Sequence, residues 1–160
     1  MSIKVGDKIP TASLTTMTES GPAPLTTSQI FDGKKVVLFS VPGAFTPTCS
    51  AKHLPGFVAH ADDLLNKGVD TIACMAVNDV FVMNAWGKSA QADKLLMLAD
   101  GNGEFALALG LELDASGFGM GQRSQRFALI VDDGVVSSVF VEAPGEFRVS
   151  SAEYVLAALA

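Results

Sequence analysis

The sequence contains only two cysteines among its 160 residues. Two cysteines are too few for the disulfide framework that stabilises small secreted domains. A chain of this length does not need such a framework, because it can bury roughly 68–70% of its unfolded surface around one hydrophobic core. Its apolar content of 49% excludes a disordered chain. We therefore expect a single domain over residues 1–160, with two free thiols.

Positive charge is also scarce, since 11 lysines and arginines face 17 aspartates and glutamates, a net charge of −6. Nucleic acids and anionic membranes are bound by basic surfaces, so neither partner is expected. The longest apolar runs, such as Val36–Phe39 and Phe127–Val131, have the length of a strand. A membrane-spanning helix needs roughly 20 apolar residues. The N-terminus shows no apolar segment after its first charges, which predicts a cytoplasmic protein with reduced thiols.

Apolar segments and helix-cap residues alternate along the chain. Apolar segments of strand length predict strands at residues 36–41, 69–77, 94–98, 126–131 and 135–141. The nearly continuous run at residues 36–41 is typical of a central strand that is buried on both faces. Cap residues predict helices over residues 46–66, 79–89, 103–109 and 151–160. The Asp-Asp-Gly sequence at residues 132–134 predicts a β-hairpin turn between the last two strands.

The first 35 residues are rich in threonine, serine, proline and glycine. This composition predicts turns at residues 21–24 and 31–34, and short strands near residues 11–14 that form a hairpin. Strands and helices alternate in the middle of the chain, and the later hairpin closes the sheet. The pattern predicts a three-layer α/β sandwich with a mixed central sheet, an N-terminal hairpin and a C-terminal helix.

Residues 41–50, Val-Pro-Gly-Ala-Phe-Thr-Pro-Thr-Cys-Ser, place a cysteine at the start of the helix that follows a central strand. Thr46 is the expected N-cap of this helix and Pro47 its first residue. Backbone N–H groups in a first turn have no intrahelical partner, and the helix dipole places partial positive charge there. Cys49 is therefore expected to favour the thiolate over the thiol. The alternative is a small buried residue of the core.

The segment Pro42–Ser50, followed by His53–Phe57, resembles the peroxiredoxin active-site motif Pro-x-x-x-Thr-x-x-Cys, and closely resembles its type II, or peroxiredoxin-five-like, branch. The resemblance extends over nearly the whole chain and includes Ile72–Asp79, the Trp86 segment and Arg126–Val131. It implies a thioredoxin-like fold. It also implies a thiol peroxidase without a cofactor, whose reactive cysteine attacks hydrogen peroxide or an alkyl hydroperoxide and becomes a sulfenic acid.

The resemblance assigns roles to the residues around Cys49, the expected nucleophile. The Thr46 hydroxyl would donate a hydrogen bond to a peroxide oxygen. The Arg126 guanidinium would stabilise the thiolate and the charge that develops on the departing oxygen. Pro42 would shield the pocket from water. His53 matches a family position that helps to order the pocket, and a purely structural histidine is an equally good interpretation.

Arg123 is the nearest alternative to Arg126 as the cationic residue. Arg126 is preferred because the Arg-Phe junction at the start of a strand matches the family, whereas Arg123 follows a glycine-rich loop at residues 117–121. Without the motif around the cysteine, either arginine would be interpreted as a solvated surface charge.

Residues 145–151 contain no cysteine, although some relatives in this branch carry a resolving cysteine there that forms an intramolecular disulfide. Cys74 lies in an apolar strand, where a buried and inert thiol is the default interpretation. An external thiol is therefore expected to reduce the Cys49 sulfenic acid. The resemblance to type II enzymes implies glutathione with glutaredoxin as its source, with thioredoxin as the other candidate reductant. The alternative is a disulfide between Cys49 and Cys74, formed after local unfolding.

The resemblance also suggests a homodimer. An exposed Phe45 or Phe118 near the pocket would fit an apolar contact between subunits or a rim that receives alkyl peroxides.

Three other functions compete with a peroxidase. Cys49, His53 and His60 would share one face of an unbroken helix and could hold a metal ion, but Pro55 is expected to kink that helix near Leu54. No metal site is therefore expected. A thioredoxin-type disulfide exchanger would need a Cys-x-x-Cys motif, which the chain lacks. A non-enzymatic thioredoxin-like interaction module would not need threonine, cysteine and arginine together in the family positions.

Overall fold

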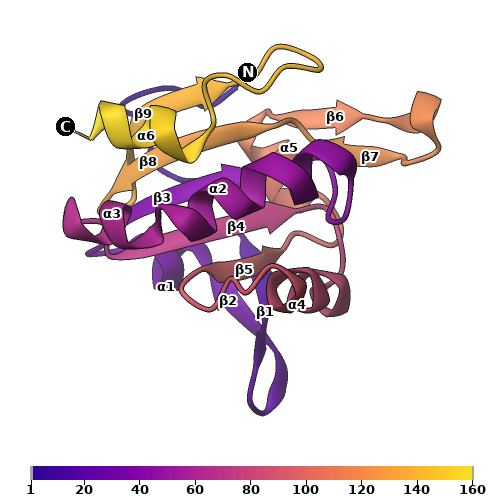
Figure 1. Ribbon diagram of the computed structural model, residues 1–160, viewed down its shortest axis with the longest axis horizontal. Helices are drawn as coiled ribbons and strands as arrows, with labels where there is room; N and C mark the ends of the chain where they lie inside the picture. Colours follow the sequence, from indigo (N-terminus) through magenta and orange to yellow (C-terminus); the bar gives the residue numbers. More distant parts are fainter. Residues whose placement is uncertain (1, 160) are drawn as a thin grey trace.

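The computed structural model describes residues 2–159, which form a seven-stranded central sheet with helices on both of its faces (Figure 1). The strands lie in the order β2-β1-β5-β4-β3-β8-β9. Their bounds are β1 Ser13–Thr18, β2 Gly21–Thr26, β3 Lys35–Ser40, β4 Thr71–Ala76, β5 Leu96–Ala99, β8 Phe127–Asp132 and β9 Val135–Val141. Strands β3, β4 and β5 are parallel, and the other neighbouring pairs are antiparallel. The predicted mixed sheet is confirmed.

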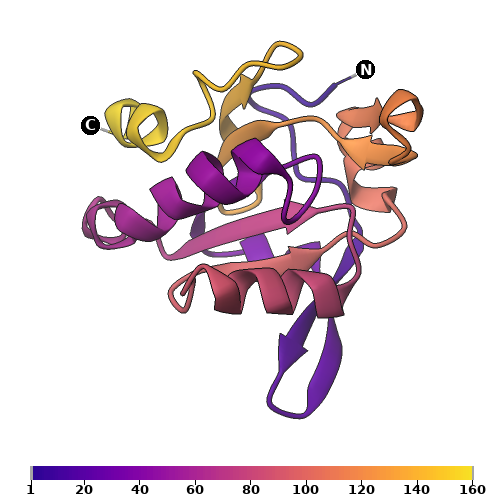
Figure 2. The ribbon, with the colours of Figure 1, turned by 45° about the vertical axis from the view of Figure 1, so that its right-hand side comes forward.

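Helices cover both faces of this sheet, and Figure 2 shows α2 and α4 in front of the central strands. The bounds are α1 Thr27–Phe31, α2 Leu54–Ala59, α3 Ala61–Asn66, α4 Val80–Ser89, α5 Glu104–Leu109 and α6 Ala152–Ala158. Val37 and Phe39 of β3 pack with α2, α3, α4 and α6, whereas Val36 and Leu38 pack with α1 and α5. Burial on both faces explains the uninterrupted apolar segments. Among residues 2–159 no helix is long and apolar enough to cross a membrane.

Local cap signals identify the starts of α4 and α6 correctly. The side chains of Asp79 and Ser151 each accept a hydrogen bond from the backbone N–H three residues further on, at the starts of α4 and α6. This interaction satisfies one of the unpaired N–H groups of a first turn. Helix α6 ends at Ala158, and the predicted end at residue 160 lies outside the described residues.

The turn between β8 and β9 also follows its sequence. Asp133 and Gly134 have φ angles of 48° and 78°. Two successive left-handed residues form the tight turn that joins twisted antiparallel strands. Gly110, with a φ of 71°, ends α5 in the same left-handed conformation.

The N-terminal hairpin lies later in the chain than predicted. Residues 21–24, predicted as a turn, belong to strand β2, and the turn is formed by Glu19 and Ser20. Strand β2 is at the edge of the sheet and pairs only with β1. An edge strand tolerates Pro22 and Pro24, because the missing N–H groups face away from the ladder.

A second, two-stranded sheet and helix α1 were not predicted. Strands β6 Glu112–Asp114 and β7 Gln122–Ser124 enclose the glycine-rich loop, with a short 3₁₀ turn at Ser116–Phe118. Strands of three residues are too short to show a repeating apolar pattern. Helix α1 has five residues and begins with a capping box between Thr26 and Gln29.

The predicted helix over residues 46–66 begins at Pro47 but is not continuous. Residues Cys49–His53 form a π-helical turn, in which the Leu54 N–H donates to the carbonyl of Cys49, five residues earlier. Pro55 follows directly and has no N–H to donate. The widened turn occurs where a kink was predicted. The helix is interrupted again at His60, between α2 and α3.

Candidate active site

Cys49 lies where the chain leaves β3 and enters the first helix of the next layer. Its side chain is completely buried, and it belongs to the core formed between the sheet and helices α2, α3, α4 and α6. It is the first residue of the π-helical turn. Single π-helical turns of this kind are frequent at functional sites. The structure therefore places Cys49 both at the start of a helix and in the buried core.

The loop between β3 and the helix is held by a hydrogen bond to the segment that follows β4. The Ala44 N–H donates to the side-chain oxygen of Asn78 at 2.8 Å. Phe45 has a φ of 64°, a left-handed conformation that is costly for an aromatic residue, and its side chain is 54% exposed. Trp86 of α4 lies behind this loop, with its ring centroid 6.4 Å from that of Phe45.

Arg126 is the residue directly before β8, and its side chain extends to Cys49. Its Nη2 donates to the Sγ of Cys49 at 3.0 Å. A guanidinium carries only hydrogen-bond donors and keeps its charge at every working pH, so the sulfur is the acceptor in this contact. A sulfur that accepts from a fixed positive charge is in the environment that stabilises a thiolate.

His53 lies one helical turn after Cys49 and contacts the other side of the same guanidinium. Arg126 Nη1 lies 2.7 Å from His53 Nδ1, and His53 Nε2 lies 2.9 Å from the carbonyl oxygen of Ser150. Because arginine has no acceptor, Nδ1 must accept, and the proton must reside on Nε2, which donates to Ser150. The network assigns a single tautomer to this imidazole.

The imidazole of His53 is uncharged. Burial and the adjacent positive charge of Arg126 lower its pKa to about 3. Aromatic rings surround it, with centroids 4.9 Å away for Phe39, 5.7 Å for Phe57 and 4.9 Å for Phe147. A neutral ring in this setting acts as an acceptor for Arg126 and does not compete with it for the negative sulfur.

Arg123 points elsewhere. Its Nη1 donates to the carbonyl of Val77 at 3.0 Å, and its Nε donates to the carbonyl of Met120 at 2.8 Å. These contacts fasten the β6–β7 hairpin to the segment that follows β4. Of the two arginines considered from the sequence, the structure brings Arg126 to the sulfur.

Thr46 and Pro42 lie on the loop that precedes the cysteine. The Thr46 hydroxyl donates to the carbonyl of Gly43 at 2.7 Å, so it does not cap the helix through its side chain, as its position suggested. With its proton engaged there, the hydroxyl presents its lone pairs to a reacting group. Pro42 is half-buried and lines the adjacent cavity.

A cavity of about 550 Å³ opens beside Arg126. Its wall includes the cations Lys52 and Arg126 and the apolar side chains of Pro42, Leu113 and Phe147. A concave site with an apolar wall and a few converging polar groups is the usual form of a small-molecule pocket.

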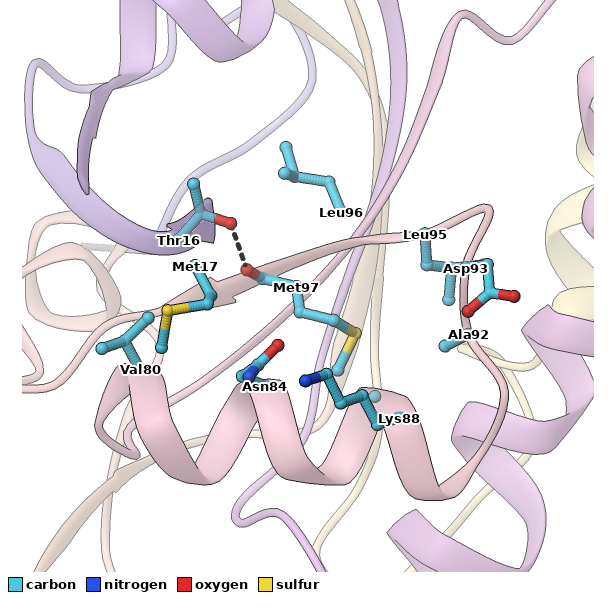
Figure 3. Close-up of a pocket in the computed structure, with 11 residues that line it drawn as sticks. Thr16, Met17, Val80, Asn84, Lys88, Ala92, Asp93, Leu95, Leu96 and Met97 are labelled. Carbon is cyan, nitrogen blue, oxygen red and sulfur yellow. Dashed lines mark hydrogen bonds between the residues drawn. The ribbon is translucent and has the colours of Figure 1, made fainter. Parts of the chain in front are cut away.

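A second cavity, of about 270 Å³, lies between α4 and the neighbouring strands β1 and β5 (Figure 3). There Thr16 donates to the carbonyl of Met97, and Asn84 and Lys88 extend from α4. No cysteine, histidine or arginine lines this cavity. Of these two cavities, only the first is lined by Arg126, the residue that contacts the Cys49 sulfur.

Cys74 is also completely buried, in the middle of β4. Burial raises the pKa of its thiol well above the usual value, and the neighbouring Cys49 raises it further. Both cysteines are free thiols. Only Cys49 has the hydrogen-bond donor that a reactive sulfur needs.

The metal site considered from the sequence has no support in the geometry. Both ring nitrogens of His53 are engaged, by Arg126 and by Ser150. His60 lies near two exposed carboxylates instead, those of Asp63 and Glu153. Within residues 2–159, no cluster of three or more histidine, cysteine or acidic side chains could hold a metal ion.

Glu142 lines the cavity beside Arg126 and was not predicted from the sequence as a residue of the site. It follows β9, is only 6% exposed, and accepts hydrogen bonds from the backbone of residues 148–150. A single glutamate at a strand end normally indicates a solvated charge. Nothing local in the sequence indicates that this one is buried.

Comparison with known proteins identifies close relatives. Residues 4–156 match the Redoxin family model. The chain is 51% identical to Peroxiredoxin-2B of Arabidopsis thaliana, over 98% of both chains, and 51% identical to the chloroplastic Peroxiredoxin-2E of the same plant, over 99% of this chain and 70% of that one. It is also similar to reduced Prx3 of Vibrio vulnificus, solved in complex with hydrogen peroxide, with 55% identity, a TM-score of 0.96 and 99% of both chains covered.

The lowered pKa of His53 predicts a loss of stability in acid. Between the unfolded value of 6.5 and the folded value of about 3, the unfolded state binds a proton that the folded state does not. The free energy of unfolding should therefore fall as the pH decreases through this range, by up to about 1.4 kcal/mol per pH unit. Urea unfolding at a series of pH values measures it. A His53→Gln variant should show a flatter dependence between pH 6.5 and 3, and an equal slope in both proteins would contradict the prediction.

Proposed function

This chain belongs to the type II peroxiredoxins of the Redoxin family, with the thioredoxin-like fold and the thiol-dependent peroxidase activity of that family, and we propose that Cys49 is the residue that attacks the peroxide. The observation that carries the proposal is the contact of 3.0 Å between Arg126 Nη2 and Cys49 Sγ, beside the cavity of about 550 Å³. A nucleophilic sulfur needs both a stabilised negative charge and access to substrate.

In the proposed reaction, the thiolate of Cys49 attacks the terminal oxygen of the hydroperoxide. The S–O bond forms as the O–O bond breaks, so the sulfur is oxidised to a sulfenic acid. The departing oxygen receives the bonding electron pair and takes up a proton to become water or an alcohol. Negative charge thus moves from the sulfur to the departing oxygen as the reaction proceeds.

Arg126 is the group placed to follow this charge. It contacts the sulfur before the reaction, and it has five donors on one planar group. An oxygen bound next to the sulfur lies within reach of the same guanidinium, which then stabilises the transition state more than the ground state.

Thr46 and Pro42 complete the proposed site. The Thr46 hydroxyl is oriented by its hydrogen bond to the carbonyl of Gly43, so it accepts a hydrogen bond from the O–H of the peroxide and aligns the peroxide for attack. To donate a hydrogen bond to the peroxide instead, the hydroxyl must rotate away from Gly43. Pro42 presents no N–H and keeps water away from the sulfur. Hydrogen peroxide and alkyl hydroperoxides are the proposed substrates. The apolar side chains of Leu113 and Phe147 in the cavity wall suit an alkyl group, and the Vibrio vulnificus relative was solved with hydrogen peroxide.

We propose that an external thiol reduces the sulfenic acid. Residues 145–151 contain no cysteine, and Cys74 is buried in a central strand. The thiol of glutathione displaces water from the sulfenic acid and forms a mixed disulfide, which glutaredoxin then reduces. Thioredoxin is the other candidate. A disulfide between Cys49 and Cys74 would require the sheet to open locally, because Cys74 pairs with Phe39 in the β3–β4 ladder.

We propose a homodimer, a single domain over the chain and a cytoplasmic location. Phe45 and Phe118 are 54% and 86% exposed, which supports an apolar contact between two copies. Two of the relatives carry chloroplastic names, so the compartment differs among close relatives.

Replacement of the nucleophile gives the first functional prediction. Cys49→Ser should abolish peroxide consumption while the protein remains folded, because a hydroxyl is far less nucleophilic than a thiolate at neutral pH. Stopped-flow consumption of hydrogen peroxide measures the activity, and circular dichroism checks the fold. Cys74→Ser is the matched control with the same chemical change. Normal turnover in Cys49→Ser would show that another residue is the nucleophile.

The two arginines should behave differently. Arg126→Gln should slow the oxidation of Cys49 by about 10²- to 10³-fold, since it removes a charged donor from the transition state. Arg123→Gln should have a much smaller effect, because its side chain contacts the carbonyls of Val77 and Met120. The measurement is the second-order rate constant with hydrogen peroxide. Equal losses in the two variants would contradict the assignment of Arg126.

Mass spectrometry can identify the thiol that reduces the Cys49 sulfenic acid. Intact-mass spectrometry after one equivalent of peroxide should show a sulfenic acid at Cys49, and added glutathione should convert it to a mixed disulfide. Cys74→Ser should retain turnover supported by glutathione and glutaredoxin. A loss of two hydrogens in the wild-type protein, with loss of turnover in a folded Cys74→Ser variant, would instead indicate an internal disulfide.

A further inference from the structure

The carboxylate of Glu142 is buried beside the active site and is satisfied almost entirely by one short segment. Its oxygens accept from the backbone N–H groups of Arg148, Val149 and Ser150 at 2.8–2.9 Å, and from the Ser150 hydroxyl at 2.7 Å. Burial alone would raise its pKa, but the hydrogen bonds from Ser150 and the neighbouring backbone lower the pKa below its usual value. The charged carboxylate therefore holds the 148–150 segment in one conformation.

That segment provides the hydrogen-bond acceptor for His53. The carbonyl of Ser150 lies 2.9 Å from His53 Nε2, and Ser150 is completely buried. If this carbonyl moved, the imidazole would lose the partner that keeps its proton on Nε2. The lone pair on Nδ1, which accepts from Arg126, depends on that same tautomer.

The backbone of Glu142 is joined to Arg126 as well. The Glu142 N–H donates to the carbonyl of Arg126 at 3.0 Å, beyond the last paired residues of β8 and β9. Glu142 is therefore connected to Arg126 by two routes. Its backbone contacts Arg126 directly, and its side chain is connected to Arg126 through the 148–150 segment and His53. This closed set of contacts fixes the guanidinium that lies on the sulfur.

We propose that Glu142 is a positioning residue for the peroxidase reaction, acting through Ser150 and His53 to hold Arg126 on the sulfur of Cys49. The inference rests on the proposed function of Cys49. Glu142 lines the same cavity as Arg126, but its carboxylate oxygens accept from residues 148–150 and have no contact with the sulfur, so its effect on the rate passes through the arginine. A displacement of the order of 1 Å at a catalytic group is enough to lower a rate by about 10²-fold.

The test compares Glu142→Gln with Glu153→Gln, which removes an equal charge from an exposed position on α6. Two quantities are measured: the second-order rate constant for oxidation by hydrogen peroxide, and the pH midpoint of Cys49 alkylation by iodoacetamide, with the site verified by mass spectrometry. Glu142→Gln should lower the rate by about 10- to 100-fold and move the midpoint upward. Glu153→Gln should leave both values within about twofold of the wild-type protein.

If Glu142 acts through Arg126, its effect should depend on the presence of Arg126. In an Arg126→Gln background, the further change Glu142→Gln should cost less than about threefold, because the group that it positions is already absent. A role in stability alone would lower the free energy of unfolding without moving the alkylation midpoint. An unchanged rate in folded Glu142→Gln, or an equal loss in the Arg126→Gln background, would overturn the proposal.

Two milder variants keep the test decisive if Glu142→Gln fails to fold. Glu142→Asp retains the charge and should give an intermediate rate. Ser150→Ala removes only the hydroxyl bond of 2.7 Å and should lower the rate about threefold. Wild-type rates in both would overturn the role of Glu142. They would leave the proposed nucleophile intact, since that proposal fails only if Cys49→Ser retains turnover.

Discussion

The contact between the Arg126 guanidinium and the Cys49 sulfur is the interaction on which the rest of the site depends. A charged group held among apolar side chains is costly unless it is paired and hydrogen-bonded. Here one side of the guanidinium meets the sulfur and the other meets a neutral imidazole. A protonated histidine in that place would repel the arginine, so the low pKa of His53 is a condition for the arrangement. The carboxylate of Glu142 is satisfied by backbone amides and does not draw the guanidinium away from the sulfur.

Sheet register creates this contact between residues that are 77 positions apart in the chain. Strands β3 and β8 are antiparallel, and Ser40 at the end of β3 pairs with Phe127 at the start of β8. The loop that leads to the cysteine and the residue just before β8 therefore emerge at the same end of the sheet. A shift of one residue in the pairing register would turn every side chain of β8 to the opposite face of the sheet. The buried apolar residues of β8 therefore fix the register, and with it the position of Arg126 next to the strand.

Features with a local cause could be predicted from the sequence, and features that depend on distant partners could not. Asp79 and Ser151 cap helices through hydrogen bonds to residues three positions away, and Asp133 with Gly134 forms a turn through its own backbone preference. The motif around Cys49 is equally local. The buried carboxylate of Glu142 depends instead on a loop that folds back on it, and no short pattern encodes that approach. The proline-rich strand β2 was predicted as a turn because prolines usually interrupt strands, and only its place at the sheet edge makes them acceptable.

The two cysteines show how position decides the chemistry of one residue type. Both are completely buried in the same core. Cys74 lies in the middle of β4, where the backbone is paired on both sides by β3 and β5. Burial there favours the neutral thiol. Cys49 lies beyond the end of β3, so its surroundings are a loop, the start of a helix and Arg126, which directly precedes β8. At this strand end the buried Cys49 sulfur has a charged partner, Arg126, that also lines a cavity. These are the surroundings that the proposed nucleophile requires, and the position of Cys74 within the sheet supplies neither of them.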